Sequence, residues 1–150
     1  MLGIEKVDHV GIRVSDRSAS VAFYERLGFR TLSDTGFEEG HPIIMRHPSG
    51  VVLNLLGPAD MPNDRNILMD VDEKYPGITH VSFRVASIDD AKGFLADRGI
   101  PLSGQFSFKD LRAVFIRDPD RNVIELDAYA GEEPEARSGD GGPAGYRAHP

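Results

Sequence analysis

Apolar and polar residues alternate in two short segments of the chain, HVGIRV at 9–14 and HVSFRV at 80–85. An alternation with a period of two is typical of a strand that buries one face. In both segments the histidine and the arginine fall on the face opposite the aliphatic and aromatic residues. The pattern therefore predicts two half-buried strands that each turn a histidine and an arginine to their polar side.

A helix is predicted to follow each of these strands. Ser87 is a suitable N-cap for the second helix, and Gly99 ends that helix as a glycine at C′ does. Ser15 or Asp16 opens the equivalent first helix, which Gly28 ends. Turn signals at 48–50 and 119–122 then lead into apolar strands at 51–56 and 123–126. The apolar run at 67–71 predicts one short extra strand.

The two halves of the chain repeat each other. When the sequence is shifted by 71 positions, residues 7–57 align with residues 78–128 without a gap. Chance would match on the order of three of these pairs. The identical pairs are His9/His80, Val10/Val81, Arg13/Arg84, Val14/Val85, Phe23/Phe94, Gly28/Gly99, Phe37/Phe108, Arg46/Arg117, Pro48/Pro119, Val52/Val123 and Leu55/Leu126. We infer that a βαβββ unit has been duplicated.

This repeat predicts an α+β fold of two βαβββ modules. The first module takes residues 1–57, a linker takes 58–76, and the second module takes 77–130. Residues 131–150 contain five Gly, three Pro and almost nothing to bury, which predicts a disordered tail. The two modules are expected to form one structural domain.

Composition narrows the chemistry that such a fold can carry. The 150 residues include no cysteine, which excludes disulfides, thiolate metal sites and a cysteine nucleophile. The formal charge of −7 argues against a nucleic-acid partner, which calls for a basic surface. No apolar run is long enough to span a bilayer, and the N-terminus does not read as a signal peptide. We therefore expect a small-molecule partner and a cytoplasmic location.

Four side chains on the polar face occupy repeat-equivalent positions. His9 and His80 begin their strands, and Asn54 and Glu125 stand in the closing strands about 45 residues later. A pseudo-twofold relation between the modules would place all four around one point. Imidazole and carboxylate ligands without thiolate suit Fe, Mn, Ni, Co or Zn, and three ligands leave positions open for a substrate. We predict one divalent metal ion, held by His9, His80 and Glu125.

Two arginines share that face. Arg13 and Arg84 each follow the histidine of their strand by four residues, where they could pair with a substrate carboxylate or enolate. The alternative interpretation places them at the rim, or as partners of Glu125 and Asp127. We assign both arginines, together with Asn54, to substrate binding. No residue is assigned as catalytic acid or base.

These motifs resemble those of the vicinal oxygen chelate superfamily, which includes glyoxalase I, extradiol dioxygenases, fosfomycin-resistance enzymes and bleomycin-binding proteins. The resemblance spans residues 7–128. It rests on DHVGIRV at 8–14, FYERLGF at 23–29, VVLNLL at 51–56, ITHVSFRV at 78–85 and DPDRNVIEL at 118–126. It implies a cupped eight-stranded mixed sheet, with the helices on its outer face, around a divalent metal. The ligand positions that it implies fall on His9, Asn54, His80 and Glu125.

Two positions separate the chain from particular branches of that superfamily. Asn54 stands where enzymes resembling glyoxalase I carry a glutamate, and an amide is a poor ligand that cannot act as a base. Phe115 stands ten residues before Glu125, where extradiol dioxygenases carry a tyrosine, and it has no hydroxyl to donate. We place Phe115 among the substrate-binding residues.

The resulting prediction is a divalent-metal-dependent, glyoxalase-like enzyme. It would use Lewis-acid chemistry, as a lyase or an isomerase, on a small oxygen-chelating substrate. A non-haem iron dioxygenase of the same superfamily is the first alternative, and a metal-free drug-binding or resistance protein is the second. A homodimer is expected because a strongly curved sheet leaves edges to protect. No membrane partner is expected.

Overall fold

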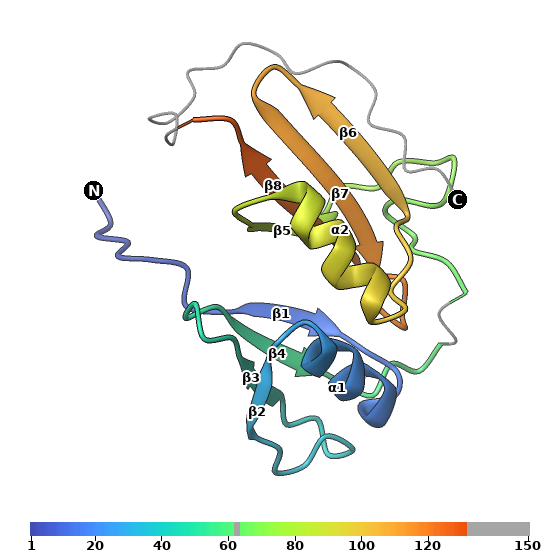
Figure 1. Ribbon diagram of the computed structural model, residues 1–150. Helices are drawn as coiled ribbons and strands as arrows, with labels where there is room; N and C mark the ends of the chain where they lie inside the picture. Colours follow the sequence, from blue (N-terminus) through green and yellow to red (C-terminus); the bar gives the residue numbers. More distant parts are fainter. Residues whose placement is uncertain (62–63, 132–150) are drawn as a thin grey trace. The chain divides into compact units, whose positions relative to one another are not determined.

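The computed structural model describes residues 1–61 and 64–131, so the predicted tail lies outside the described residues from position 132 onward. The elements are β1 (Val10–Arg13), α1 (Arg17–Arg26), β2 (Arg30–Ser33), β3 (Ile43–Arg46), β4 (Val52–Leu56), β5 (His80–Arg84), α2 (Ile88–Asp97), β6 (Gly104–Phe108), β7 (Leu111–Arg117) and β8 (Val123–Tyr129) (Figure 1). The prediction of an α+β fold with two βαβββ modules is confirmed.

The chain folds into two compact units. Within the described residues, unit 1 comprises Met1–Asp64 together with the turn Asp118–Asn122, and unit 2 comprises the rest. Each unit holds one mixed four-stranded sheet, in the order β1-β4-β3-β2 in unit 1 and β5-β8-β7-β6 in unit 2. The strand before the helix runs parallel to the last strand of its unit, and the other neighbours are antiparallel.

The strand pairings confirm the repeat at the level of single residues. Gly11 of β1 pairs with Asn54 of β4, and the residues 71 positions later, Ser82 and Glu125, pair in the same way. On the other side of β8, Phe115 lies opposite Glu125, as Ile44 lies opposite Asn54. The same offset therefore gives the same neighbours in both sheets.

The helices repeat as well. Asp16 caps α1 by accepting a hydrogen bond from the backbone of Ala19, and Ser87 caps α2 in the equivalent position. Of the two candidates for the first cap, Asp16 is therefore the one used. Gly28 and Gly99 follow the two helices with φ of 97° and 64°, a conformation that favours glycine. Each helix has ten residues, and no helix of the described chain is long and apolar enough to cross a bilayer.

Each sheet buries the face that its helix covers. The residues on this face alternate with polar ones along each strand, as the sequence pattern predicts. A buried aliphatic or aromatic side chain contributes roughly 1.5–3 kcal/mol. The buried apolar side chains of the sheet and helix in unit 1 include Ile12, Val14, Tyr24, Ile43, Met45, Leu53 and Leu55. Those of unit 2 include Ile88, Leu95, Val114, Ile116, Ile124 and Leu126.

The prediction of a short strand at 67–71 is wrong, because these residues form a turn. The side chain of Asn66 accepts hydrogen bonds from the backbone amides of Leu68 at 2.9 Å and Met69 at 3.2 Å. Asp70 in turn accepts from the backbone amide of Asn66 at 2.7 Å. These side chains satisfy backbone groups that a strand would pair elsewhere, which is how Asn and Asp favour turns over strands.

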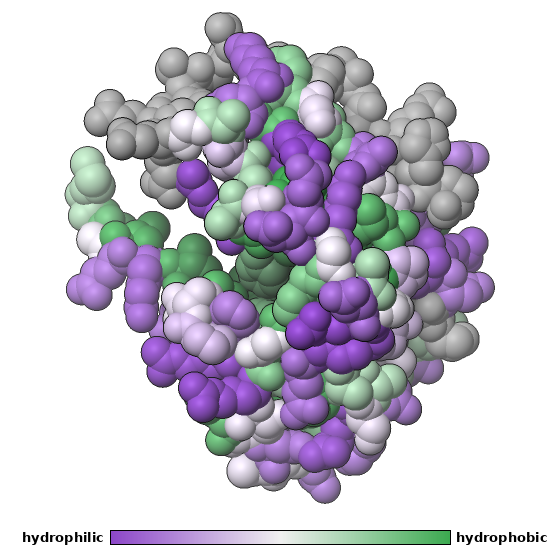
Figure 2. Space-filling model, viewed as in Figure 1, coloured by the Kyte–Doolittle hydropathy of each residue, from purple (hydrophilic) through white to green (hydrophobic). Residues whose placement is uncertain are grey.

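The segment before β1 is irregular and exposed. It carries an apolar surface, drawn in green at the left of Figure 2, that no described residue covers. Its large apolar residues are Met1, Leu2, Ile4 and Val7. Of the predicted site residues, His9 belongs to this segment, as its last residue directly before β1.

Candidate metal centre

A histidine and a glutamate meet on the face of the unit 2 sheet that lies opposite α2. The parallel pairing of β5 with β8 brings His80 Nε2 to 2.9 Å from Glu125 Oε2. The other ring nitrogen, Nδ1, lies 2.8 Å from the hydroxyl of Thr79. The Glu125 side chain is 12 % exposed and that of His80 35 % exposed. Two of the three predicted ligands are therefore in contact and open to solvent on one side.

Two neighbouring residues extend this polar cluster along the same strands. Ser82 donates a hydrogen bond of 2.5 Å to Asp127 Oδ2. The other carboxylate oxygen of Asp127 is buried and accepts no hydrogen bond within the described chain. Burial, followed by the charge and a hydrogen bond of Asp127, raises the pKa of Glu125 to about 7. A cation beside these carboxylates would favour their charged forms.

Phe115 borders the cluster from β7. It is the neighbour of Glu125 in the antiparallel β7–β8 pairing. Its ring meets that of His80 edge to face, with the ring centroids 6.5 Å apart. The ring is 2 % exposed. Phe115 thus stands beside two predicted ligands, and its assignment to substrate binding stays a prediction.

In unit 1, His9 repeats part of this arrangement. Its Nδ1 lies 2.9 Å from Asp8 Oδ2, and this hydrogen bond, followed by the charge of His9, lowers the pKa of Asp8. Asp8 and Thr79 are related by the repeat, so both histidines have Nδ1 engaged by the preceding side chain. A metal-binding histidine commonly holds its second ring nitrogen in this way, which leaves Nε2 for the metal.

Asn54 lies on the same face as His9, because the β1–β4 register places it opposite Gly11. Its side-chain oxygen is buried and accepts no hydrogen bond from any described residue. A buried acceptor without a donor costs about 1–3 kcal/mol. Asn54 is the repeat equivalent of Glu125, so an oxygen without a partner occurs where the other unit carries its carboxylate.

The two arginines have different surroundings. The guanidinium of Arg84 lies 5.0 Å from the centre of the Tyr129 ring, a cation–π contact at the exposed end of β5. The side chain of Arg13 is exposed, and its backbone carbonyl accepts a hydrogen bond from Asn122 at 3.1 Å. Arg84 therefore has an aromatic neighbour that orients it, and Arg13 is fixed through its backbone.

The donor set fits a divalent metal in its chemistry. It supplies two imidazoles, each with Nδ1 engaged, and one largely buried carboxylate in contact with one of them. Among residues 1–61 and 64–131, no three His, Asp or Glu side chains are grouped so that they could hold a metal ion. The structure brings together His80 and Glu125 in unit 2, and it places His9 and Asn54 on unit 1.

Three polar neighbours of the ligands were missed in the sequence: Asp8, Thr79 and Ser82. Asp127 was considered only as a partner of an arginine, whereas it accepts a hydrogen bond from Ser82. Asp8 and Thr79 directly precede the two histidines and are related by the repeat offset. A polar residue at both positions could have indicated that each side chain contacts its histidine. The Ser82–Asp127 hydrogen bond joins residues 45 positions apart. It becomes visible only once the β5–β8 register is known.

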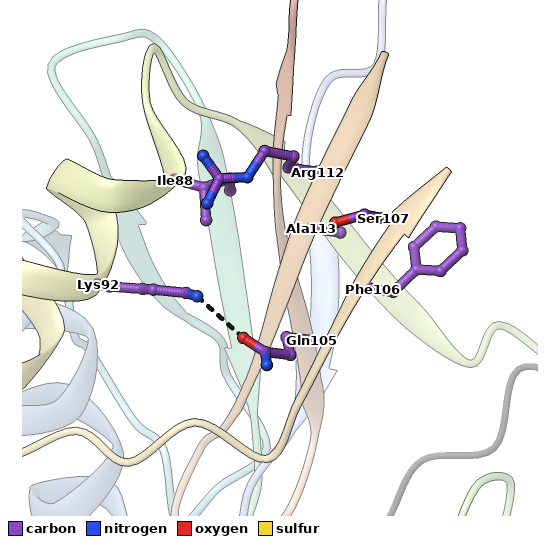
Figure 3. A pocket seen from close by; sticks show the side chains of 7 residues that line it. All are labelled: Ile88, Lys92, Gln105, Phe106, Ser107, Arg112 and Ala113. Carbon is purple, nitrogen blue, oxygen red and sulfur yellow. Dashed lines mark hydrogen bonds between the residues drawn. The ribbon is translucent and has the colours of Figure 1, made fainter. Parts of the chain in front are cut away.

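A separate pocket lies on the helix side of the unit 2 sheet, between α2 and the strands β6 and β7. Lys92 donates to the side-chain oxygen of Gln105 across it at 2.9 Å (Figure 3). Figure 3 also shows Phe106 pointing away from the helix. The lining residues are Ile88, Lys92, Gln105, Phe106, Ser107, Arg112 and Ala113. None of them is a predicted ligand, so this pocket is not part of the candidate metal centre.

The family of the chain follows from comparison with known proteins. The sequence model of the Glyoxalase/Bleomycin resistance protein/Dioxygenase superfamily matches residues 6–126. This match covers most of the chain, including the first copy of the repeat, the second copy as far as residue 126, and all the predicted site residues. The chain therefore belongs to this superfamily, as its resemblance to vicinal oxygen chelate proteins predicted.

Individual relatives are distant. The chain is 28% identical over 134 residues to the uncharacterized protein YwkD of Bacillus subtilis, a match that covers 82% of this chain and 96% of that protein. It is 26% identical over 145 residues to lactoylglutathione lyase of Schizosaccharomyces pombe, covering 81% of this chain and 44% of the lyase. The crystal structure of a glyoxalase family protein from Enterococcus faecalis superposes with a TM-score of 0.69 at 25% identity, covering 83% and 98% of the two chains.

Proposed function

We propose that the protein binds one divalent metal ion through His9, His80 and Glu125 and acts on a small oxygen-chelating substrate. The observation that carries this proposal is the contact of 2.9 Å between His80 Nε2 and Glu125 Oε2 on the polar face of unit 2. Membership of a superfamily that includes glyoxalases and dioxygenases supports a metal-dependent reaction. The metal would be Fe, Mn, Ni, Co or Zn.

Each residue has a distinct task in this proposal. His80 and Glu125 would supply two ligands from one unit, and His9 would supply the third through its Nε2. When bound, the metal would act as a Lewis acid on substrate oxygens. Arg84 and Arg13 would bind a carboxylate or enolate of the substrate. Asn54 would donate or accept a hydrogen bond and would not act as an acid or base, because a carboxamide does not ionise near neutral pH.

We favour a lyase or isomerase reaction over oxygen chemistry because of Phe115. This residue lies beside His80 and Glu125 and has no hydroxyl. An iron dioxygenase remains the first alternative, since two histidines and one glutamate are the facial arrangement of non-haem iron oxygenases. Phe115→Tyr would raise oxygen consumption with catechols if that alternative holds.

A metal-free binding protein is the second candidate. The observation that favours it is the apolar cluster of Ala113, Phe115 and Val123, which lies next to the polar residues of the same face and would have to be uncovered from Met69 and Phe106 to meet a ligand. An apolar surface with a few polar groups is typical of small-molecule binding sites, and the family description includes a bleomycin resistance protein.

Anaerobic reconstitution with each candidate metal, followed by metal analysis, separates these possibilities. The proposal expects one metal per chain in the wild type and strongly reduced binding in His80→Ala. The loaded protein is then assayed with hemithioacetals, catechols, and fosfomycin with thiols. A wild type that binds no metal under any condition would contradict the proposal and favour the metal-free binding protein.

Two further expectations belong to this proposal. The protein would form a homodimer, which light scattering after size-exclusion chromatography tests directly. It would act in the cytoplasm. A monomer at micromolar concentration would contradict the first expectation and leave the metal ligands unaffected.

A further inference from the structure

A methionine of the turn at 66–70 lies on the ligand-bearing face of unit 2. Ala113, Phe115 and Val123 form a buried apolar cluster on this face, and Met69 and Phe106 pack against the cluster. We call Asn66–Asp70 the strap. It covers apolar side chains that would otherwise be open to solvent beside His80 and Glu125.

The strap is fixed at both of its ends. The Asn66 side chain holds the backbone amides of Leu68 and Met69. At the other end, Asp70 forms an ion pair of 2.7 Å with Arg117 of β7, and both side chains are largely buried at 13 % and 10 % exposure. A partly buried ion pair with good geometry is costly to break from one side. The position of Met69 is therefore well defined.

The strap divides this face into an open part and a closed part. His80, Ser82 and Arg84 of β5 are exposed. Phe115, whose ring meets that of His80, is 2 % exposed because the strap and Phe106 cover its cluster. A ligand whose polar atoms reach His80 and Glu125 therefore finds the adjacent apolar surface closed.

We propose that Met69 is a specificity-determining residue that limits the size of the apolar group next to the ligand's oxygen atoms. The site accepts an oxygen-chelating compound with a methyl-sized substituent and excludes a phenyl-sized one, because Met69 occupies that volume. This inference rests on the proposed function for the chelating part of the ligand. The strap itself is defined by the contacts of unit 2 alone.

The test compares two ligands with the same chelating group, acetohydroxamate and benzohydroxamate. Each is titrated into the full-length protein, with zinc and without it, while the labelled methyl group of Ala113 is followed by NMR. We expect Met69→Ala to bind benzohydroxamate about tenfold more tightly than the wild type does, since a ring replaces the lost methylene and sulfur contacts. Its affinity for acetohydroxamate is expected to change less than twofold.

Two variants control for loss of structure. Met69→Leu keeps the volume and should retain the preference of the wild type. Leu68→Ala shortens the neighbouring residue, whose side chain lies against Gly77, and should also leave the preference unchanged. A general loosening of the strap would instead alter all three variants alike.

The outcomes separate this inference from the proposed function. Absence of zinc binding contradicts the metal site, and the zinc-free titrations still decide the role of Met69. If Met69→Ala shows no gain for benzohydroxamate in either form while it remains folded, Met69 does not set the size limit. A wild type that binds both ligands equally, with a shift at Ala113, would overturn the inference as well.

Discussion

The strands within unit 1 pair in the same register as the equivalent strands within unit 2. The equivalent positions nevertheless carry different side chains on the polar face. Where unit 2 has Glu125, unit 1 has Asn54, and where unit 2 has Asp127, unit 1 has Leu56. The Ser82–Asp127 hydrogen bond has no counterpart, because Gly11 stands in place of the serine. Both units retain the histidine. The carboxylates are concentrated on one unit.

The helix side shows a difference of another kind. Tyr24 of α1 and Leu95 of α2 are repeat equivalents, and both are buried. The Tyr24 hydroxyl donates to Asp118 Oδ2 at 3.0 Å, so it holds the turn Asp118–Asn122 within unit 1. Burial raises the pKa of Asp118, and burial followed by the charge of Asp118 raises that of Tyr24. The equivalent helix position is therefore buried in both units, whereas only unit 1 has a hydroxyl there that bonds to Asp118.

The largest expected effect lies in the ligands themselves. His80→Ala or Glu125→Ala should weaken metal binding at least about 100-fold, since loss of a supporting residue alone costs 10–100-fold. Asn54→Ala is the matched control in the other unit and should change affinity less than about threefold. Isothermal titration calorimetry with Co²⁺ or Zn²⁺ measures all three. If all three variants lost metal affinity equally, Asn54 would be as important for the metal as His80 and Glu125, which would contradict the prediction.

The second expected effect concerns pH. The folded-state pKa of Glu125 is raised from 4.5 to about 7, so the folded protein holds an extra proton between these values. The stability of the metal-free protein therefore falls as pH rises from 4.5 to 7. Glu125→Gln should remove this component, so the variant gains stability relative to the wild type across that window. Urea denaturation at several pH values measures the difference, and a constant difference would contradict the assigned environment.

Restoring the symmetry of the units should have a smaller effect. Asn54→Glu adds a charged oxygen at the repeat equivalent of Glu125, and we expect metal affinity to rise about tenfold. Weak isomerase activity toward hemithioacetals would also follow, since a carboxylate can exchange a proton. Asn54→Gln is the control without charge. An Asn54→Glu variant with unchanged affinity would show that Asn54 does not face the metal.

The smallest expected effect concerns the helix side. Tyr24→Phe removes the hydroxyl that donates to Asp118 and should destabilise the protein by about 1–2 kcal/mol. Asp118 keeps its hydrogen bonds from the backbone of Asp120 and Asn122. Metal affinity should not change. Thermal denaturation provides the measurement, and a variant as stable as the wild type would show that the hydroxyl contributes nothing.

Much of the fold could be predicted because the repeat doubled each signal. Periodicity and the offset of 71 predicted the strand–helix–strand order and the two C′ glycines. They also predicted that His80 and Glu125 lie on the same face. The turn at 66–70 could not, because Ile67, Leu68 and Met69 are apolar and read as a strand. Asn66 and Asp70 decide the structure there through hydrogen bonds that depend on local geometry. The role of Asp127 was hidden because its partner is distant in sequence.

The central claim is that one metal is shared by His9, His80 and Glu125. X-ray absorption spectroscopy of the cobalt-loaded protein tests it most directly, because multiple scattering from imidazole counts the bound histidines. The account predicts one cobalt per chain with two imidazole ligands, falling to one imidazole in His9→Ala. A spectrum with a single imidazole in the wild type, unchanged by His9→Ala, would contradict it.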